Sequence, residues 1–279
     1  MKIAVTGATG QLGQIVIEKL KEKIDPRNIF ALVRVPQKAA DFKVEIREAD
    51  YDKPHLLETA LEGIDTLILI SGSEIGKRAQ QHLNIVAAAK KSGVKRIVYT
   101  SLLHADDTSL GIADEHVITE GLIKSSGIDY TILRNGWYTE NYAASVRSGI
   151  ESGSFYGSAN DGKISAAPRQ DYAEAIVAVA TSEGHQGQTY ELAGDEAFTL
   201  TELAEELSRQ INKPVSYINL HPEEYIKSLI TLGVPEGVAQ MLTGIDASIS
   251  KGDLFDDSHQ LSKLIGRPTR PLKSNILLL

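Results

Sequence analysis

The feature that most constrains the fold is an alternation of short apolar runs, rich in β-branched residues, with helical stretches through the first half of the chain. Strands are expected at 2–6, 29–34, 44–48, 66–70, 96–100 and 130–133, and helices at 11–23, 56–62, 78–92 and 116–124. No hairpin turn separates consecutive strands, so this order predicts a parallel sheet with right-handed crossovers. We therefore predict an α/β fold, a doubly wound parallel sheet. In helix 78–92, Leu83, Val86 and Ala87 form the expected buried stripe.

The alternation ends after residue 134, and a different organisation follows. A glycine-punctuated, loop-rich segment covers 135–170, and the chain from Thr199 onward is mostly helical. Thr199 to Glu202 has the pattern of a capping box, in which a hydroxyl and a carboxylate satisfy free amides at a helix start. We predict one large domain at 1–195, with cleft loops at 135–170, and a smaller, mainly helical C-terminal lobe on the substrate side at 196–279.

A glycine-rich turn follows the first expected strand and opens the first expected helix. It reads Thr-Gly-Ala-Thr-Gly-Gln-Leu-Gly from Thr6 to Gly13, with the spacing G-x-x-G-x-x-G. Glycines in such a turn allow its tight bend, the close approach of a pyrophosphate and the packing of helix on sheet, and free amides at the helix start hold the anion. The turn predicts a dinucleotide-binding Rossmann domain. Its candidate cofactor-binding residues are Gly7, Ala8, Thr9, Gly10, Gln11, Leu12 and Gly13.

The residue at the end of the second expected strand indicates which dinucleotide binds. NAD-selective domains commonly have an Asp or Glu there, which hydrogen-bonds the ribose 2′-hydroxyl and would repel a 2′-phosphate. This chain has Arg34, whose planar guanidinium can bind a phosphate through two hydrogen bonds, and Lys38 is close enough to add charge. We predict NADPH as the cofactor. The alternative is a solvated arginine at a strand end.

Two further segments follow expected strands at the carboxyl edge of the sheet, where the ligand crevice of such folds lies. Small side chains in the first segment let the backbone approach a cofactor. The candidate cofactor-binding residues are Ser71, Gly72 and Ser73 after the fourth strand, and Asn135, Gly136, Trp137 and Tyr138 after the sixth.

Composition and charge argue against several classes of function. Among 279 residues, 29 are Lys or Arg and 37 are Asp or Glu, and the net charge of −8 repels nucleic-acid backbones. The absence of Cys excludes thiol catalysis and Cys-ligated metals, and the histidines show no metal-binding spacing. The apolar runs fall far short of a membrane span or a signal-peptide core. We expect a cytoplasmic protein without a metal, a nucleic-acid partner or a membrane span, and a homo-oligomer is compatible with these features.

Several motifs are longer and more specific than the glycine turn. They occupy 5–13, 33–34, 49–51, 99–106, 113–116, 133–138, 190–195 and 252–258. Over nearly its whole length the chain thus resembles the NmrA-like branch of the atypical short-chain dehydrogenases. The resemblance implies two-electron reduction of quinones by NADPH without flavin. It also implies that Gly7 to Leu12, Arg34, Ser71 to Ser73 and Asn135 to Tyr138 line the cofactor cleft. Because Trp137 and Tyr138 are aromatic and follow a strand end, we predict that they form a flat wall for a quinone or the nicotinamide, and core packing is the alternative for Trp137.

The chain departs from the wider short-chain dehydrogenase pattern at the catalytic pair. It contains no Tyr-x-x-x-Lys, and alignment puts His116 at the lysine position and Ile112 at the tyrosine position. Ketone chemistry thereby loses its proton relay, whereas hydride addition to a quinone gives a hydroquinone anion that water can protonate. No catalytic residue is assigned. His116 and His104 are candidate proton donors, and a hydrogen-bonding role at a helix start is the alternative for His116.

Three functions are compatible with these features. The leading hypothesis is an NADPH:quinone oxidoreductase. The alternative is a non-catalytic, NADP(H)-binding redox-sensing regulator of the NmrA type, for which no proton relay is needed. The third is an epimerase or ketone reductase, which normally needs a positioned acid with a tuned pKa, and the sequence shows none.

Overall fold

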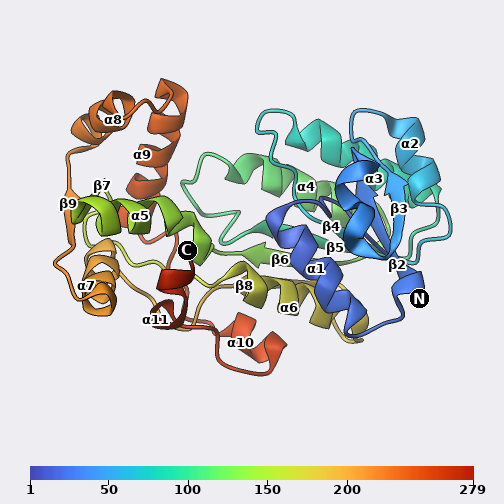
Figure 1. The fold of residues 1–279 in the computed structure, drawn as a ribbon. Helices are drawn as coiled ribbons and strands as arrows, with labels where there is room; N and C mark the ends of the chain where they lie inside the picture. The colour runs from blue at the N-terminus through green and yellow to red at the C-terminus, as the bar shows by residue number, and fades with distance from the viewer. The chain divides into compact units, whose positions relative to one another are not determined.

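The computed structural model describes residues 1–279 and divides the chain into two compact units (Figure 1). Unit 1 comprises Met1–Asp106, Ile112–Asn135 and Arg169–Tyr190. Unit 2 comprises Asp107–Gly111, Gly136–Pro168 and Glu191–Leu279. No helix of the chain is both long enough and apolar enough to cross a membrane.

A seven-stranded sheet forms the centre of unit 1, in the order β3-β2-β1-β4-β5-β6-β8. Its strands are β1 (Ile3–Val5), β2 (Ile29–Val33), β3 (Glu45–Glu48), β4 (Thr66–Leu69), β5 (Arg96–Leu102), β6 (Asp129–Asn135) and β8 (Gln188–Leu192). Neighbouring strands from β3 to β6 pair in parallel. The predicted doubly wound α/β fold is therefore confirmed. The strand order reverses between β1 and β4, the point at which such folds bind their ligands.

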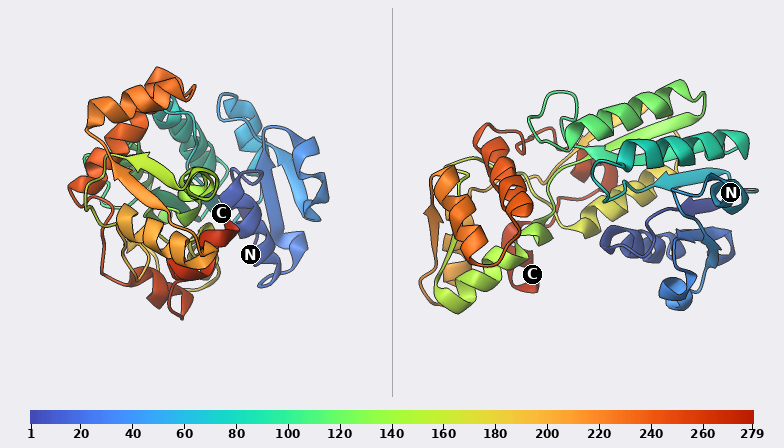
Figure 2. Two further views of the ribbon diagram at one scale, coloured as in Figure 1. Left: turned by 60° about the vertical axis from the view of Figure 1, so that its left-hand side comes forward. Right: turned by 90° about the horizontal axis from the view of Figure 1, so that it is seen from above.

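Helices cover both faces of this sheet (Figures 1 and 2). They are α1 (Gln11–Lys21), α2 (Pro54–Ala60), α3 (Arg78–Lys91), α4 (Ala113–Ser125) and α6 (Arg169–Thr181), with 3₁₀ turns η1 (Pro26–Asn28) and η2 (Pro36–Phe42). α1 packs with α6, whereas α3 packs with α2 and α4. Every residue of β4 is buried, as its continuous apolar run predicts for a central strand. The sheet and its helices thus enclose an apolar core that fixes the ends of the strands.

The buried face of α3 differs from the predicted stripe. Val86 is buried as expected, but Leu83 and Ala87 are exposed. The buried face instead carries Arg78 and His82 beside apolar residues. These polar side chains can be buried because each has hydrogen-bond partners in the loop that follows β4.

Unit 2 combines a small sheet with helices. Its elements are η3 (Thr139–Tyr142), α5 (Ala143–Ser152), β7 (Ser154–Gly157), α7 (Leu200–Ile211), β9 (Ser216–Asn219), α8 (Pro222–Thr231), α9 (Glu236–Ser250), α10 (Gln260–Ile265), α11 (Leu272–Asn275) and η4 (Ile276–Leu278). β7 and β9 form a two-stranded parallel sheet, which the sequence did not predict because both strands are short and β9 is only half-buried. The predicted capping box at Thr199 and Glu202 is present with both hydrogen bonds.

The division into units differs from the boundary predicted at residue 195. Residues 136–168 and 191–195 belong to unit 2 together with the whole segment 196–279. The pairing of β7 with β9 explains this, because it joins the loop-rich segment after β6 to the C-terminal lobe. α5 also packs against α7. The segment predicted as cleft loops is therefore part of the lobe's own core.

Candidate functional site

The glycine turn after β1 has the geometry that close backbone packing requires. Gly7 has a φ of +59°, and Gly10 N–H donates a 2.9 Å hydrogen bond to Gly7 C=O. A Cβ on Gly13 would lie 2.2 Å from that carbonyl oxygen and 2.8 Å from the Ala8 Cα. Only glycine fits at position 13, because no side chain tolerates such a contact with backbone. Gly7 and Gly10 are exposed, while Gly13 is buried under the turn.

The first turn of α1 leaves its amides without side-chain partners. Gly10 is the N-cap residue and provides no capping side chain, and the first helical turn contains no acidic residue. The amides of Gln11, Leu12 and Gly13 are therefore available at the positive end of an 11-residue helix. This arrangement suits a bound anion.

Thr6 joins the end of β1 to the end of β4. Its hydroxyl accepts a 3.0 Å hydrogen bond from Ile70 N–H, and its own N–H donates to Ile68 C=O at 3.0 Å. The segment Ser71–Ser73 begins at the next residue, so the glycine turn and this segment lie side by side at the point where the strand order reverses. The structure thus brings these two sequence-predicted segments together.

The peptide groups of Gly72 are held from both sides by side chains of α3. Gly72 N–H donates to His82 Nε2 at 3.1 Å, and Arg78 Nε donates to Gly72 C=O at 2.7 Å. Ser71 N–H donates to Thr100 Oγ1 at 2.9 Å, which ties the segment to β5 as well. The segment is therefore fixed in place by buried side chains.

His82 is held as a neutral ring. Its Nε2 accepts from a backbone N–H, so the ring proton is on Nδ1 and faces Thr119 Oγ1 at 2.9 Å. The Thr119 hydroxyl in turn donates to Glu115 C=O at 2.7 Å. Burial, followed by the charge of Arg78, lowers the pKa of His82 to about 3. The imidazole thus serves as a fixed hydrogen-bond acceptor at neutral pH.

His116 lies in the first turn of α4 and contacts Tyr99. Its Nδ1 is 2.8 Å from the Tyr99 hydroxyl, and both residues are buried. Burial, followed by the charge of Arg78, lowers the pKa of His116 to about 3. The ring is therefore uncharged at neutral pH, which favours the hydrogen-bonding role over that of a proton donor. His104, the second candidate, lies in the loop after β5 with a φ of +51°.

Arg34 lies at the end of β2, as predicted, and its side chain is 63% exposed. Its Nη1 is 2.6 Å from Glu74 Oε1, a residue of the loop after Ser73. Lys38 is also exposed. Arg34 is thus neither buried nor solely solvated, because its guanidinium pairs with a carboxylate beside the Ser71–Ser73 segment.

An ion network that is buried at Arg134 and Glu120 and exposed at Asp106 fixes the ends of β5 and β6. Arg134 binds Glu120 through Nε and Nη2, each at 2.9 Å, and binds Asp106 through Nη1 at 2.8 Å and Nη2 at 3.0 Å. Ser101 Oγ donates to Glu120 at 2.7 Å. Leu103 N–H donates to Asn135 C=O at 3.0 Å, which extends the pairing to the predicted site residue. Sequence analysis found the motifs around Asp106 and Arg134 but not this pairing.

In unit 2, the residues that follow Asn135 are held in an extended conformation. Gly136 N–H donates to Leu192 C=O at 2.7 Å, and Ala167 N–H donates to Trp137 C=O at 3.1 Å. Tyr138 forms a parallel bridge with Ala167. The side chains of Trp137 and Tyr138 are half-buried. Neither residue is fully enclosed by the core, and their contact with a substrate stays a prediction.

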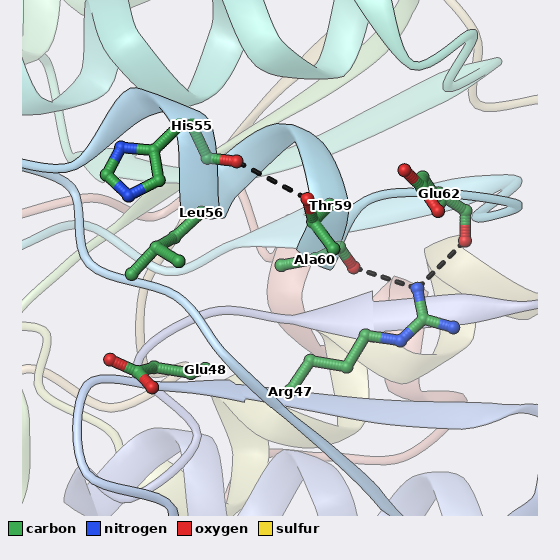
Figure 3. Close-up of a pocket in the computed structure, with 7 residues that line it drawn as sticks. All are labelled: Arg47, Glu48, His55, Leu56, Thr59, Ala60 and Glu62. Carbon is green, nitrogen blue, oxygen red and sulfur yellow. Dashed lines mark hydrogen bonds between the residues drawn. The ribbon is translucent and has the colours of Figure 1, made fainter.

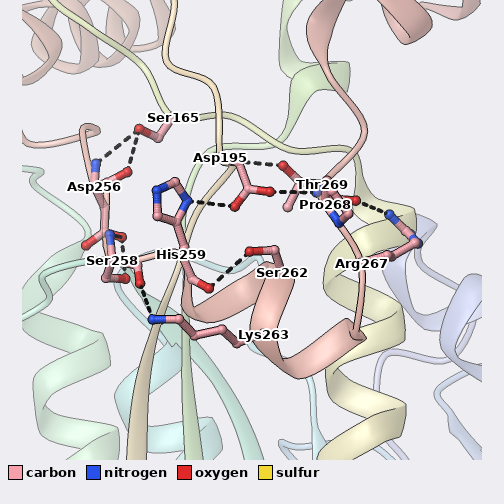
Figure 4. A network of polar contacts seen from close by, with 10 residues as sticks. All are labelled: Ser165, Asp195, Asp256, Ser258, His259, Ser262, Lys263, Arg267, Pro268 and Thr269. Carbon is pink, nitrogen blue, oxygen red and sulfur yellow. Dashed lines mark hydrogen bonds and ion pairs between the residues drawn. The ribbon is translucent and has the colours of Figure 1, made fainter.

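The sequence motifs at 190–195 and 252–258 meet loops of unit 2 (Figure 4). His259 Nδ1 is 2.9 Å from Asp195 Oδ1, and Thr269 N–H donates to Asp195 Oδ2 at 2.8 Å. Ser165 Oγ donates to Asp256 C=O at 2.9 Å. These contacts give the two motifs a structural role in joining α10 and its neighbours.

A separate cavity of about 510 Å³ lies at the β3 edge of the sheet (Figure 3). It is lined by Arg47, Glu48, His55, Leu56, Thr59, Ala60 and Glu62. Arg47 Nη1 donates to the carbonyls of Ala60 and Glu62, at 3.0 and 2.8 Å. None of the sequence-predicted site residues lines this cavity, so it does not belong to the candidate site.

Comparisons with known proteins agree with this architecture. The chain is 52% identical over 277 residues to quinone oxidoreductase 2 of Escherichia coli K12, covering 98% of this chain and 97% of that protein. The crystal structure of the E. coli NADPH-dependent quinone oxidoreductase with NADPH superimposes with a TM-score of 0.97 at 52% identity, covering 99% of both chains. The NADP(H) complex of Citrobacter sp. triphenylmethane reductase gives 0.93 at 38% identity, with 99% of both chains covered. The model of the NmrA-like family matches residues 1–272, and the chain therefore belongs to the NmrA-like family.

Proposed function

We propose that this chain is an NADPH:quinone oxidoreductase that reduces quinones by two electrons without flavin. The observation that carries the proposal is the turn from Gly7 to Gly13, where the Gly13 site excludes any Cβ and the first turn of α1 has neither a capping side chain nor an acidic residue. This cradle fits the pyrophosphate of a dinucleotide. Bound NADPH would supply a hydride, and the protein's contribution is to bind and orient the reactants.

Each candidate residue has a role in this proposal that its position supports. In unit 1, Gly7 to Gly13 and Ser71 to Ser73 bind through backbone, Arg34 binds the 2′-phosphate, and Asn135 ends β6. In unit 2, Gly136 contacts the ligand through its peptide groups, and Trp137 and Tyr138 provide an aromatic surface for the planar substrate. An arginine guanidinium suits a phosphate because it can donate two parallel hydrogen bonds.

Quinones suit this chain better than ketones because its position for the catalytic lysine holds His116. That imidazole is buried and neutral, so it cannot replace an ammonium group that lowers the pKa of a tyrosine. Reduction of a quinone needs no acid of that kind during hydride addition. The E. coli relative, named a quinone oxidoreductase and solved with NADPH, supports the same substrate class at 52% identity.

A steady-state assay tests the proposal. Purified protein is mixed with NADPH and 1,4-benzoquinone, and loss of the reduced-nicotinamide absorbance is compared with the uncatalysed rate. We expect turnover with NADPH and weaker turnover with NADH. NADPH binding by calorimetry, measured in parallel, separates a protein that fails to bind from one that binds without reacting.

The regulator alternative predicts a different outcome of the same pair of measurements. A redox-sensing regulator would bind NADPH or NADP⁺ tightly, would discriminate between the two forms, and would not oxidise NADPH with any quinone. Binding without turnover would therefore replace the enzyme proposal by the regulator.

A further inference from the structure

Unit 2 contains a buried carboxyl group that the proposed roles leave unused. Asp246 lies on α9 and is 9% exposed. Its Oδ2 accepts a 2.7 Å hydrogen bond from Ser158 N–H, whereas Oδ1 accepts none, and the carboxyl has no cationic partner. Burial raises the pKa of Asp246 to about 6, with the Ser158 contacts acting in the opposite direction. At this pKa, roughly one tenth of the carboxyl is protonated at pH 7, and the protonated fraction rises as the pH falls.

Two hydroxyl groups close to this carboxyl are buried without a hydrogen bond. Tyr142 is 7% exposed and Ser158 is 5% exposed. Neither hydroxyl makes a hydrogen bond of standard geometry, although the Trp137 indole lies beside the Tyr142 hydroxyl and the Asp246 carboxyl lies beside the Ser158 hydroxyl. Ser158 is the residue whose N–H binds Asp246. For Tyr142, the charge of Asp246 is second only to burial in raising the pKa well above its ordinary value. Buried hydroxyls normally have partners, so these two retain hydrogen-bonding capacity that the protein itself does not use fully.

The other titratable groups around Asp246 do not exchange protons near neutral pH. Tyr217 on β9 donates to Asn219 Oδ1 at 2.8 Å and accepts from Ala159 N–H at 3.0 Å. Burial, and to a lesser degree the Asp246 charge, raises the pKa of Tyr217 to about 12. The same two causes raise the pKa of Tyr225 on α8. Asp246 is therefore the group of this cluster that can release a proton.

The cluster adjoins the aromatic residue proposed to contact the substrate. The Trp137 indole acts on the Tyr142 hydroxyl and lowers its pKa, which places the two side chains next to each other. A planar ring lying against Trp137 would therefore present an oxygen substituent toward Tyr142.

We propose that Asp246 donates the proton that completes quinone reduction, and that the hydroxyls of Tyr142 and Ser158 hydrogen-bond the substrate oxygen that receives it. This inference rests on the proposed function. Addition of the hydride, which brings two electrons, converts the quinone into a hydroquinone monoanion with one phenolate oxygen. The O–H bond of the Asp246 carboxyl breaks at Oδ1, a new O–H bond forms on the phenolate, and the carboxylate then takes a proton from water. Because a phenol ordinarily has a pKa of about 10, proton transfer from the carboxyl group to the phenolate is favourable.

The test compares wild type with Asp246→Asn in the pH dependence of kcat for 1,4-benzoquinone reduction by NADPH. Asn keeps an acceptor for Ser158 N–H but has no proton to donate. We expect the wild-type kcat to fall about tenfold per pH unit above about pH 6, and the variant to be slower and flat over that range. Asp161→Asn is the matched control, because Asp161 is an exposed carboxyl that influences Tyr217 but not the donor. It should keep the wild-type profile.

Tyr142→Phe gives a second readout that does not depend on turnover. The substitution keeps the edge-to-face packing of the ring on Phe198, at 5.8 Å between centroids, and removes only the hydroxyl. If that hydroxyl binds the substrate oxygen, the KM for quinone rises and the calorimetric affinity for hydroquinone falls, each by about tenfold, while the melting temperature stays the same or rises. A purely structural tyrosine would leave both binding values unchanged.

The possible outcomes distinguish failure of the proposed function from failure of the inference about Asp246. No wild-type turnover at any pH contradicts the proposed function and this inference with it. Turnover with the same alkaline decline in Asp246→Asn contradicts the role of Asp246 alone. Should Asp246→Asn not melt cooperatively, unchanged quinone KM and hydroquinone affinity in Tyr142→Phe contradict the inference.

Discussion

Arg34 Nη1 donates a 2.6 Å hydrogen bond to Glu74 Oε1 and so links the end of β2 to the loop after β4. Glu74 also accepts from Gln81 Nε2 at 3.3 Å, which orients its carboxylate. A phosphate bound by Arg34 must displace this carboxylate or tolerate its charge. The Glu74 carboxylate would therefore compete with the 2′-phosphate of NADPH for the guanidinium of Arg34.

Glu74→Gln should bind NADPH more tightly, because it removes the competing charge and keeps the size of the side chain. An exposed ion pair contributes ~0.2–1 kcal/mol, so the Kd should fall by roughly 1.5- to 5-fold. NADH, which has no 2′-phosphate, should be unaffected. Calorimetric titration with both cofactors measures the difference, and Glu45→Gln, which removes the partner of Arg47 instead, is the control. Equal changes for NADPH and NADH would refute the competition.

Arg34→Asp should weaken NADPH far more than NADH. A charge-assisted hydrogen bond to phosphate contributes about 1.5–3 kcal/mol, which corresponds to a loss of roughly 10- to 150-fold in NADPH affinity. The side chain is largely exposed and bonds only Glu74 among protein groups, so folding should be preserved. Kd values from cofactor fluorescence would measure the loss of affinity for NADPH and for NADH. A similar loss for both cofactors would mean that Arg34 does not select between them.

Gly13→Ala should abolish cofactor binding, because its Cβ would lie 2.2 Å from the Gly7 carbonyl oxygen and push α1 away from the turn. The matched control is Gly121→Ala on the exposed side of α4, where a Cβ meets nothing within 4 Å. Replacing a helical glycine by alanine should stabilise that variant by roughly 0.5–1 kcal/mol without changing the affinity. Thermal melting with and without NADPH reports both effects. Wild-type affinity in Gly13→Ala would invalidate the proposed pyrophosphate site.

Acid should destabilise the protein through His82 and His116. Both have their pKa lowered from 6.5 to about 3 in the folded chain, so the unfolded chain binds more protons between these values. Stability should therefore be complete above about pH 6.5 and should fall as the pH decreases toward 3. The free energy of unfolding should fall by several kcal/mol, because each imidazole contributes on the order of 1.4 kcal/mol for each unit by which its pKa is lowered. Urea unfolding across this pH range should show that the free energy of unfolding depends less steeply on pH in His116→Gln than in wild type. Identical slopes would mean that His116 does not contribute to the acid destabilisation.

The parts of the fold that depend on local pattern could be predicted from the sequence. The parallel sheet follows from alternating apolar runs, and the capping box at Thr199 follows from two residues three apart. The turn at Gly7 has the positive φ that its glycine allows. Each of these features is decided by neighbours in the chain, which is why a pattern reveals it.

Features decided by partners distant in the chain could not be predicted. The burial of His82 depends on Gly72 and Thr119, and the buried carboxyl of Asp246 accepts its hydrogen bond from Ser158, 88 positions away. The stripe expected at Leu83 failed for the same reason, because polar side chains with fixed partners took the buried face of α3. The cytoplasmic location and the oligomeric state stay predictions.

The grip of Arg78 and His82 on the two peptide groups of Gly72 has a thermodynamic consequence. A loop that is already immobilised by its scaffold loses little conformational entropy when a ligand arrives, so more of the contact energy is expressed as affinity. Cofactor recognition by this segment therefore depends on α3, whose side chains hold the segment's backbone. A substitution that loosens the packing of α3 should therefore lower the affinity for the cofactor under conditions in which the domain is still folded.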